Sequence, residues 1–163
     1  AALQRAMTIG ASYLPTAPAG ALDPADAVPE LSRRARGFAT WAIIRTLGRQ
    51  GIAALIDQHC RLAHRLAERL AAEPGVAVLN EVDLNQVIVQ FGATEPPERR
   101  DELTRAVITH TQAAGVCFAG GARWKGRWVM RLSVIAWPMT TSDIDRAAAS
   151  ILAAWRHVQT GSG

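Results

Sequence analysis

EPGVAVLNEVDLNQVIVQFG, residues 73–92, contains the pattern that decides the fold class. The Glu-Pro-Gly breaker at 73–75 ends a helical repeat, because proline lacks an amide hydrogen and glycine favours turns. Two apolar runs follow it, at 76–81 and 84–91. Apolar and other side chains alternate in the second run, which is typical of a half-buried strand. This stretch predicts a change from helix to strands, and the alternating core residues are Val87, Val89 and Phe91.

Two helices are predicted before this stretch. From Ile52 to Leu70 apolar residues recur at spacings of three and four, which indicates one face of a helix. Pro29 fits a first helical turn, so a preceding helix is expected from about Glu30 to Gly48. Its middle, FATWAII, is apolar nearly all round, which is typical of a helix covered on several sides. Because 163 residues alone are too few to supply that cover, we expect something else to cover it.

Further helices and strands are predicted after this stretch. A third helix is expected between Pro96 and Gly115, and two strands at 115–121 and 127–135, around a turn. A last helix opens near Thr140. Capping-box spacing there joins Thr140 to Asp143 and also Ser142 to Asp145. The order predicts an α+β fold with a small, mainly antiparallel sheet and helices on one face.

Composition indicates a globular protein. The chain has 163 residues, of which 49% are hydrophobic and 20% charged. Its net charge of +4 comes from 17 Arg and one Lys against 14 acids. These arginines are spread along the chain, which argues against a polyanion site. Two cysteines, Cys60 and Cys117, are expected to be reduced and buried in a cytoplasmic protein. No apolar run is long enough for a membrane helix.

The residues give little support for a metal site or a nucleophilic triad. The four histidines, at 59, 64, 110 and 157, have no completing carboxylate or cysteine at ligand spacing. No GxSxG motif occurs. Lys125 is expected to be a solvated hairpin residue and not a cofactor-holding lysine.

The segment ARWKGRW, residues 122–128, leaves two interpretations open. Alternating basic and aromatic side chains can form a stacking platform for single-stranded nucleic acid. The favoured interpretation is that Trp124 and Trp128 pack on the sheet while the basic side chains reach water.

Three stretches together resemble the group II pyridoxal-phosphate (PLP) dependent decarboxylases. They are ASYLP (11–15), PELSRRARGFATWAIIRTLGRQGIAALI (29–56) and GRWVMRLSVIAWPMTTSDIDRAAASI (126–151). The resemblance implies the C-terminal part of a fold-type I PLP enzyme: a catalytic-loop-like arm (1–28) from the end of the large domain, a connecting helix (29–50) and the C-terminal small domain (51–163). It also implies that the Schiff-base lysine precedes Ala1 and that no cofactor-binding residue lies in this chain. The absence of an initial Met agrees with a piece of a longer protein.

The resemblance also implies roles for individual residues. Tyr13 matches the tyrosine of the family's mobile loop, which protonates the substrate Cα after CO2 leaves. Arg33, Arg34 and Arg36 match an arginine-rich helix start that anchors the loop or a carboxylate. Arg131 matches a strand arginine; by alternation we expect it to be partly buried and paired, with a structural ion pair favoured over substrate binding.

The implied function is that of a PLP-dependent L-amino-acid decarboxylase, a carboxy-lyase working as a cytoplasmic homodimer. The chain alone, without its lysine, is expected to be inactive and to need the PLP-binding large domain as a partner. Neither nucleic acid nor membrane is an expected partner. The alternatives are another fold-type I enzyme, such as an aminotransferase, and a basic nucleic-acid-binding domain.

Overall fold

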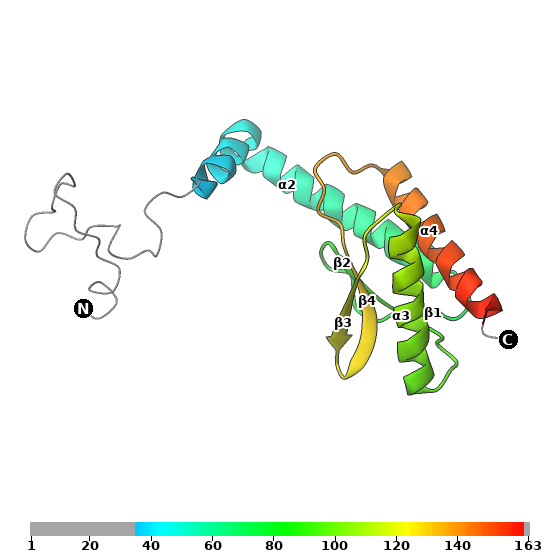
Figure 1. The fold of residues 1–163 in the computed structure, drawn as a ribbon. Coiled ribbons are helices and arrows are strands. Elements are labelled where there is room, and N and C mark those ends of the chain that lie inside the picture. The colour runs from blue at the N-terminus through cyan, green and yellow to red at the C-terminus, as the bar shows by residue number, and fades with distance from the viewer. Residues whose placement is uncertain (1–34, 162–163) are drawn as a thin grey trace, which may run out of the picture. The chain divides into compact units, whose positions relative to one another are not determined.

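The computed structural model describes residues 35–161 of the chain. Two compact units divide the chain, Ala1–Thr46 and Leu47–Gly163, and each is described by itself. The elements, in order, are α2 (Arg36–Ala71), β1 (Val76–Val78), β2 (Gln86–Phe91), α3 (Pro97–Ala114), β3 (Gly120–Trp124), β4 (Arg127–Ser133) and α4 (Thr141–Thr160) (Figure 1).

The two helices expected before residue 73 form one helical element, α2, interrupted at Gly48. The φ of 60° and ψ of −175° at Gly48 are not helical, and glycine reaches such a conformation with little cost. The predicted apolar stripe is confirmed only for its second half. Burial begins at Leu62 and continues to Leu70, whereas Ile52 and Ile56 stay partly or largely exposed.

The apolar FATWAII segment belongs to the first unit, and its cover by something outside this chain stays a prediction. Within that unit its large side chains are more than half exposed, and nothing described there covers them. Phe38 and Trp41 lie against each other, with ring centroids 5.7 Å apart.

The sheet has four strands in the order β1-β2-β4-β3, and every neighbouring pair is antiparallel. Pairing of β1 with β2 extends past Val78, where the Asn80 side chain takes the place of a backbone partner. The Asn80 Oδ1 accepts from the Ile88 amide at 2.8 Å, and its Nδ2 donates to the Gln86 carbonyl at 3.1 Å. Because the Asn80 side chain, and not its backbone, forms these hydrogen bonds with β2, the regular strand β1 ends before this residue.

The first strand of the last hairpin was predicted too early. Residues 116–118 lie outside any strand, and β3 begins at Gly120. Gly115 ends α3 in the left-handed region at φ 68°, and a two-residue turn at Lys125 (φ 48°) and Gly126 (φ 79°) then joins β3 to β4. Positive φ at both positions suits the twist of a tight hairpin, so the turn sets the register and the strand bounds.

Helices α2, α3 and α4 contribute to one core on one face of the sheet, which confirms the α+β prediction. The core-facing residues of β2 are as expected, with Val87, Val89 and Phe91 completely buried, whereas Gln90 between them is also buried and so departs from the half-buried pattern. In Figure 1 α3 and α4 lie to one side of the sheet. Helical members of this core include Leu66, Leu70, Val107, Ile144, Ile151 and Trp155.

Candidate functional site

Arg131, the candidate on β4, lies on the face of the sheet away from the core. It pairs with Ile88 of β2 and with Gly120 of β3. The expected face is correct, but the side chain is exposed and not partly buried as the alternation suggested, and the expected ion pair stays a prediction. Its side chain is exposed and has no hydrogen-bond or ion-pair partner within residues 35–161. The reason is that the helices cover the opposite face, which the neighbours Met130 and Leu132 share.

A free arginine on a sheet is a ready partner for a carboxylate. Its planar guanidinium can donate two parallel hydrogen bonds to one carboxylate group. Among residues 35–161 no group uses the donors of the Arg131 guanidinium, so they can serve a ligand or another part of the protein.

The other predicted site residues are placed only in part. Arg36 is the first residue of α2 and is exposed, in the first unit. Tyr13, Arg33 and Arg34 lie outside the described residues. Of the predicted set, the structure therefore describes Arg36 and Arg131, which belong to different units.

The described residues do not fit a PLP site. Lys125 stands exposed at a turn, with its Nζ 4.4 Å from the centroid of the Trp124 ring. A cofactor-holding lysine needs an enclosed site with partners for the phosphate and the ring. The described residues form cavities of about 560, 290 and 210 Å³, and none of these is lined by lysine.

Metal ligands do not gather in the described part either. No group of three or more His, Cys, Asp or Glu side chains within residues 35–161 could hold a metal ion. The His110 and His157 rings pack edge to face, with centroids 4.7 Å apart, while His59 contacts the Ala136 carbonyl at 3.3 Å. Across the same residues, no helix combines the length and apolar character needed to cross a membrane.

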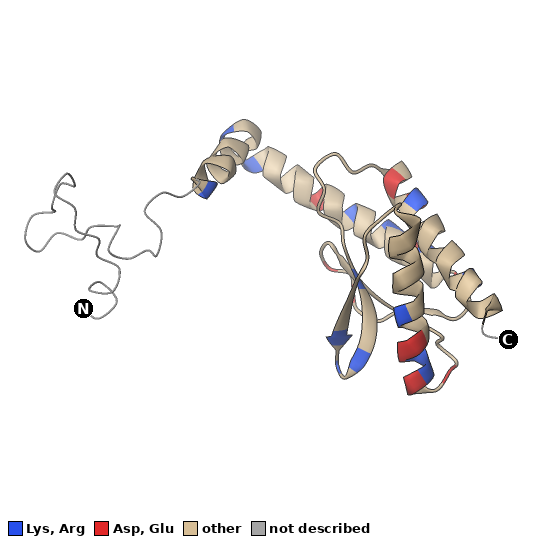
Figure 2. Ribbon diagram, viewed as in Figure 1, with Lys and Arg blue, Asp and Glu red and all other residues tan. Residues whose placement is uncertain are grey.

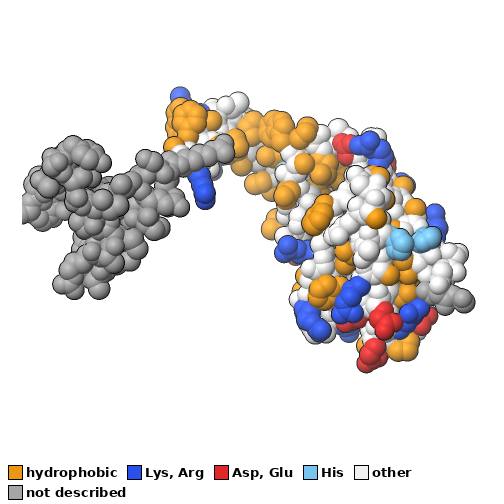
Figure 3. Space-filling model, in the orientation of Figure 1, with side chains coloured by type: hydrophobic (Ala, Val, Ile, Leu, Met, Phe, Trp, Pro, Cys, Tyr) orange, Lys and Arg blue, Asp and Glu red, His pale blue; other side chains and the backbone are white. Residues whose placement is uncertain are grey.

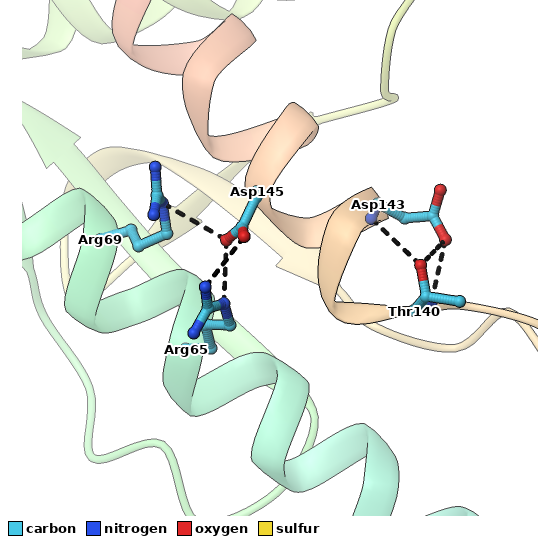
Figure 4. Close-up of polar contacts among 5 residues, drawn as sticks. All are labelled: Arg65, Arg69, Thr140, Asp143 and Asp145. Atoms are coloured by element: carbon cyan, nitrogen blue, oxygen red, sulfur yellow. Dashed lines mark hydrogen bonds and ion pairs between the residues drawn. The ribbon is translucent and has the colours of Figure 1, made fainter.

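An ion-pair cluster joins α2 to the start of α4 (Figure 4). The Arg65 guanidinium donates twice to the Asp145 carboxylate, with both distances 2.9 Å, and Arg69 approaches the same group at 3.5 Å. The hydrogen bonds from Arg65 hold the pKa of Asp145 below its usual value, and the pKa of Arg65 is raised. Sequence reasoning missed this cluster.

The capping box at α4 is formed by one of the two predicted pairs. The Thr140 side chain accepts from the Asp143 amide at 3.3 Å, and the Asp143 carboxylate accepts from the Thr140 amide at 2.9 Å. The hydrogen bond from the Thr140 hydroxyl is the main cause of the lowered pKa of Asp143. These contacts fix the start of α4 and the loop that follows β4.

Comparison with known proteins identifies the family. The sequence pattern described as "Pyridoxal-dependent decarboxylase conserved domain" matches residues 1–92. The chain belongs to this family. Tyrosine decarboxylase 2 of Arabidopsis thaliana is 24% identical over 130 residues, which cover 79% of this chain and 23% of that protein.

Solved structures of pyridoxal-dependent decarboxylases and related proteins share the fold. Oryza sativa TDC with PLP and tryptamine matches with a TM-score of 0.69 and 19% identity over 77% of this chain and 27% of that one. Mouse CSAD matches with a TM-score of 0.70 and 22% identity over 93% of this chain and 34% of that one. A Rhodiola rosea 4-hydroxyphenylacetaldehyde synthase matches with a TM-score of 0.71 and 22% identity, over 83% and 29%. This member of the family therefore spans about a quarter to a third of the length of these relatives.

Proposed function

We propose that this chain is the C-terminal small domain of a PLP-dependent L-amino-acid decarboxylase. Membership of the pyridoxal-dependent decarboxylase family, together with the shared fold, carries the proposal. The complete protein would release the α-carboxylate of its substrate as CO2 and place a proton on Cα. PLP, when bound, supplies an electron sink for this reaction. The lysine that holds it would lie outside these residues, so the chain alone would be inactive.

Arg131 is the described residue best suited to bind the substrate. Its exposed, unpaired guanidinium supports a role in gripping a carboxylate, and this replaces the structural ion pair favoured from the sequence. Tyr13 would donate the proton to Cα, since a phenol can act as a general acid where a closed loop excludes water. Arg33, Arg34 and Arg36 would anchor that loop.

The complete protein would work as a homodimer in the cytoplasm. The arm at 1–28, the connecting helix at 29–50 and the small domain at 51–163 would join a PLP-binding large domain. Free Cys60 and Cys117 are compatible with a reducing compartment, although both are only partly buried and not fully buried as the sequence suggested.

Another reaction on the same fold, such as transamination, remains the enzymatic alternative, because a shared fold does not determine which reaction takes place at the substrate Cα. One structural relative is named as an aldehyde synthase. The nucleic-acid alternative loses support at the 122–128 segment, where Lys125 lies over Trp124 and Arg105 lies over Trp128, at 4.4 and 4.9 Å from the ring centroids.

Product analysis of the complete protein tests the proposal. The polypeptide encoded by the whole reading frame is incubated with PLP and a panel of L-amino acids, and CO2 and amine are measured. We expect equal amounts of both from at least one substrate. A keto acid that forms only with an added acceptor, and without CO2, would identify an aminotransferase instead.

The role of Arg131 is tested in the same protein by Arg131→Met, with Arg127→Met as the matched control. Both arginines are exposed on β4 and four residues apart on one face. Loss of a charge-assisted pair should raise KM about 10- to 100-fold in R131M, with kcat changed less. R127M should keep the original KM. An unchanged KM with lower thermal stability in R131M would mean that its role is structural.

A further inference from the structure

Two histidines from different helices lie in contact with each other. His110 belongs to α3 and His157 to α4, and their rings pack edge to face with centroids 4.7 Å apart. Both side chains are exposed. The histidine side chains drawn in pale blue in Figure 3 lie side by side on the surface. The packing of α3 against α4 therefore creates a pair of imidazoles that no spacing in the sequence predicts.

The ring nitrogens of this pair, called the His110–His157 pair here, are not used by the fold. Among residues 35–161 no group forms a hydrogen bond or ion pair with either ring. His59 differs, because its ring nitrogen contacts the Ala136 carbonyl at 3.3 Å. A neutral imidazole carries a lone pair on one nitrogen, and histidine is the commonest metal ligand among side chains. Two lone pairs are therefore available side by side.

The separation of the two rings suits adjacent positions around one metal ion. Zinc–nitrogen bonds are about 2.0–2.1 Å long, so two imidazoles at about 90–110° around one ion have centroids about 4.5–5.2 Å apart. The 4.7 Å between the His110 and His157 centroids lies within this range. Since no group of three or more ligand side chains occurs in residues 35–161, such a site has two protein ligands and is completed by water.

The charged residues of α3 and α4 do not oppose a metal ion at this pair. Those of α3 lie between Glu98 and Arg105, and the rest of the helix, tan in Figure 2, carries none. Arg156 precedes His157, but its guanidinium donates to the Glu73 carboxylate at 2.6 Å and its charge is offset there. His157 also lies in the last turn of α4, where the helix dipole favours a positive charge.

We propose that His110 and His157 form a binding site for a divalent transition-metal ion such as Zn²⁺, Ni²⁺ or Cu²⁺. Imidazole nitrogen suits these ions, whereas Mg²⁺ and Ca²⁺ prefer oxygen ligands. The ion joins α3 to α4. Because the two ligands come together only when both helices are packed, the ion binds the folded chain and stabilises it.

This site is independent of PLP and of the proposed reaction. Helices α3 and α4 contribute to the core on one face of the sheet, whereas Arg131 lies on the opposite face. A metal ion at the His110–His157 pair therefore acts on the packing of two helices and not on a substrate held by that arginine. Its effect is a metal-dependent stability of the second unit, whichever reaction the complete protein performs.

Isothermal titration of the 163-residue chain with Zn²⁺, in the absence of a histidine tag, tests this site. The variants are His110→Gln and His157→Gln, with His64→Gln as the matched control, since His64 is an exposed histidine of α2 outside the pair. We expect one Zn²⁺ per chain and at least about ten-fold weaker binding in H110Q and in H157Q, because loss of even a group that supports a ligand costs that much. H64Q should bind like the parent chain. Equal affinities in all four proteins, or no saturable binding to the parent chain, would overturn the proposal.

Two further measurements show whether the ion lies within one folded chain. At a free Zn²⁺ concentration of 100 times Kd, the unfolding equilibrium constant of the parent chain should fall about 100-fold, measured by urea denaturation. H110Q and H157Q should show a fall of about ten-fold at most at the same concentration, and a response equal to that of the parent chain would place the ion elsewhere. Sedimentation velocity of the parent chain should be unchanged by Zn²⁺. A dimer that forms only with Zn²⁺ would mean that the ion bridges two chains, and the proposal would be wrong.

Discussion

Replacing Leu70 by Ala, with Leu84→Ala as the matched control, tests where the core of the second unit lies. Leu70 is completely buried at the end of α2, whereas Leu84 is 62% exposed in the loop between β1 and β2. The truncation removes an isopropyl group, whose transfer from water is worth about 2.4 kcal/mol at about 0.8 kcal/mol per carbon. The cavity left behind adds about 1 kcal/mol. We expect L70A to lower the free energy of unfolding by about 3–4 kcal/mol.

Urea denaturation of the 163-residue chain, followed by far-ultraviolet circular dichroism, measures this difference. The free energy of unfolding of L84A should lie within about 0.5 kcal/mol of that of the parent chain, because the Leu84 side chain is already largely solvated. The m-value should be the same for all three proteins, which shows that the same surface unfolds. Equal losses in the two variants, or a loss below about 1 kcal/mol in L70A, would refute the assigned core.

Three further substitutions test local features of the second unit. Gly75→Ala should destabilise the chain by about 1–2 kcal/mol or more, because φ is 80° and the new Cβ would lie 2.8 Å from Cζ2 of Trp155; thermal melting measures it, and an unchanged Tm would contradict the backbone assignment. Thr140→Ala should cost about 1 kcal/mol through loss of the helix cap, read from the urea midpoint; no change would argue against the capping box. Because the pKa of Asp145 is lowered by Arg65, its stabilisation is present above the ordinary value of 3.8 and is lost as pH falls through the folded-state pKa. Asp145→Asn should therefore be less stable at neutral pH and lose less stability in acid, and a pH profile parallel to that of the parent chain would contradict this role.

The elements with a local repeat were predictable from sequence. Val87, Val89 and Phe91 occupy every second position within the single strand β2. Side chains at such positions point to the same face, so their common burial follows from the pattern alone. The link between Thr140 and Asp143 is also local, since a capping box spans one helical turn. In contrast, the start of β3 was predicted too early. Residues 116–118 have the apolar composition of a strand, but they pair with no neighbouring strand, and β3 begins at Gly120.

Features set by distant residues could not be predicted. Arg65 and Asp145 are 80 positions apart, and only the packing of α2 beside α4 brings them within 2.9 Å. Alternation identified the face of β4 that carries Arg131, but not which face the helices cover. Family resemblance supplied the cofactor and the roles of Tyr13 and Arg33, none of which the described residues could reveal.

We propose that this member of the decarboxylase family supplies a small domain and that the cofactor lysine lies elsewhere in the complete protein. Borohydride reduction after incubation with PLP, followed by peptide mapping, tests it most directly because reduction fixes a Schiff base to its lysine. For the 163-residue chain we predict no saturable adduct on Lys125. For the complete protein we predict one modified lysine per subunit, outside these residues. A saturable, one-to-one adduct on Lys125 would contradict the account.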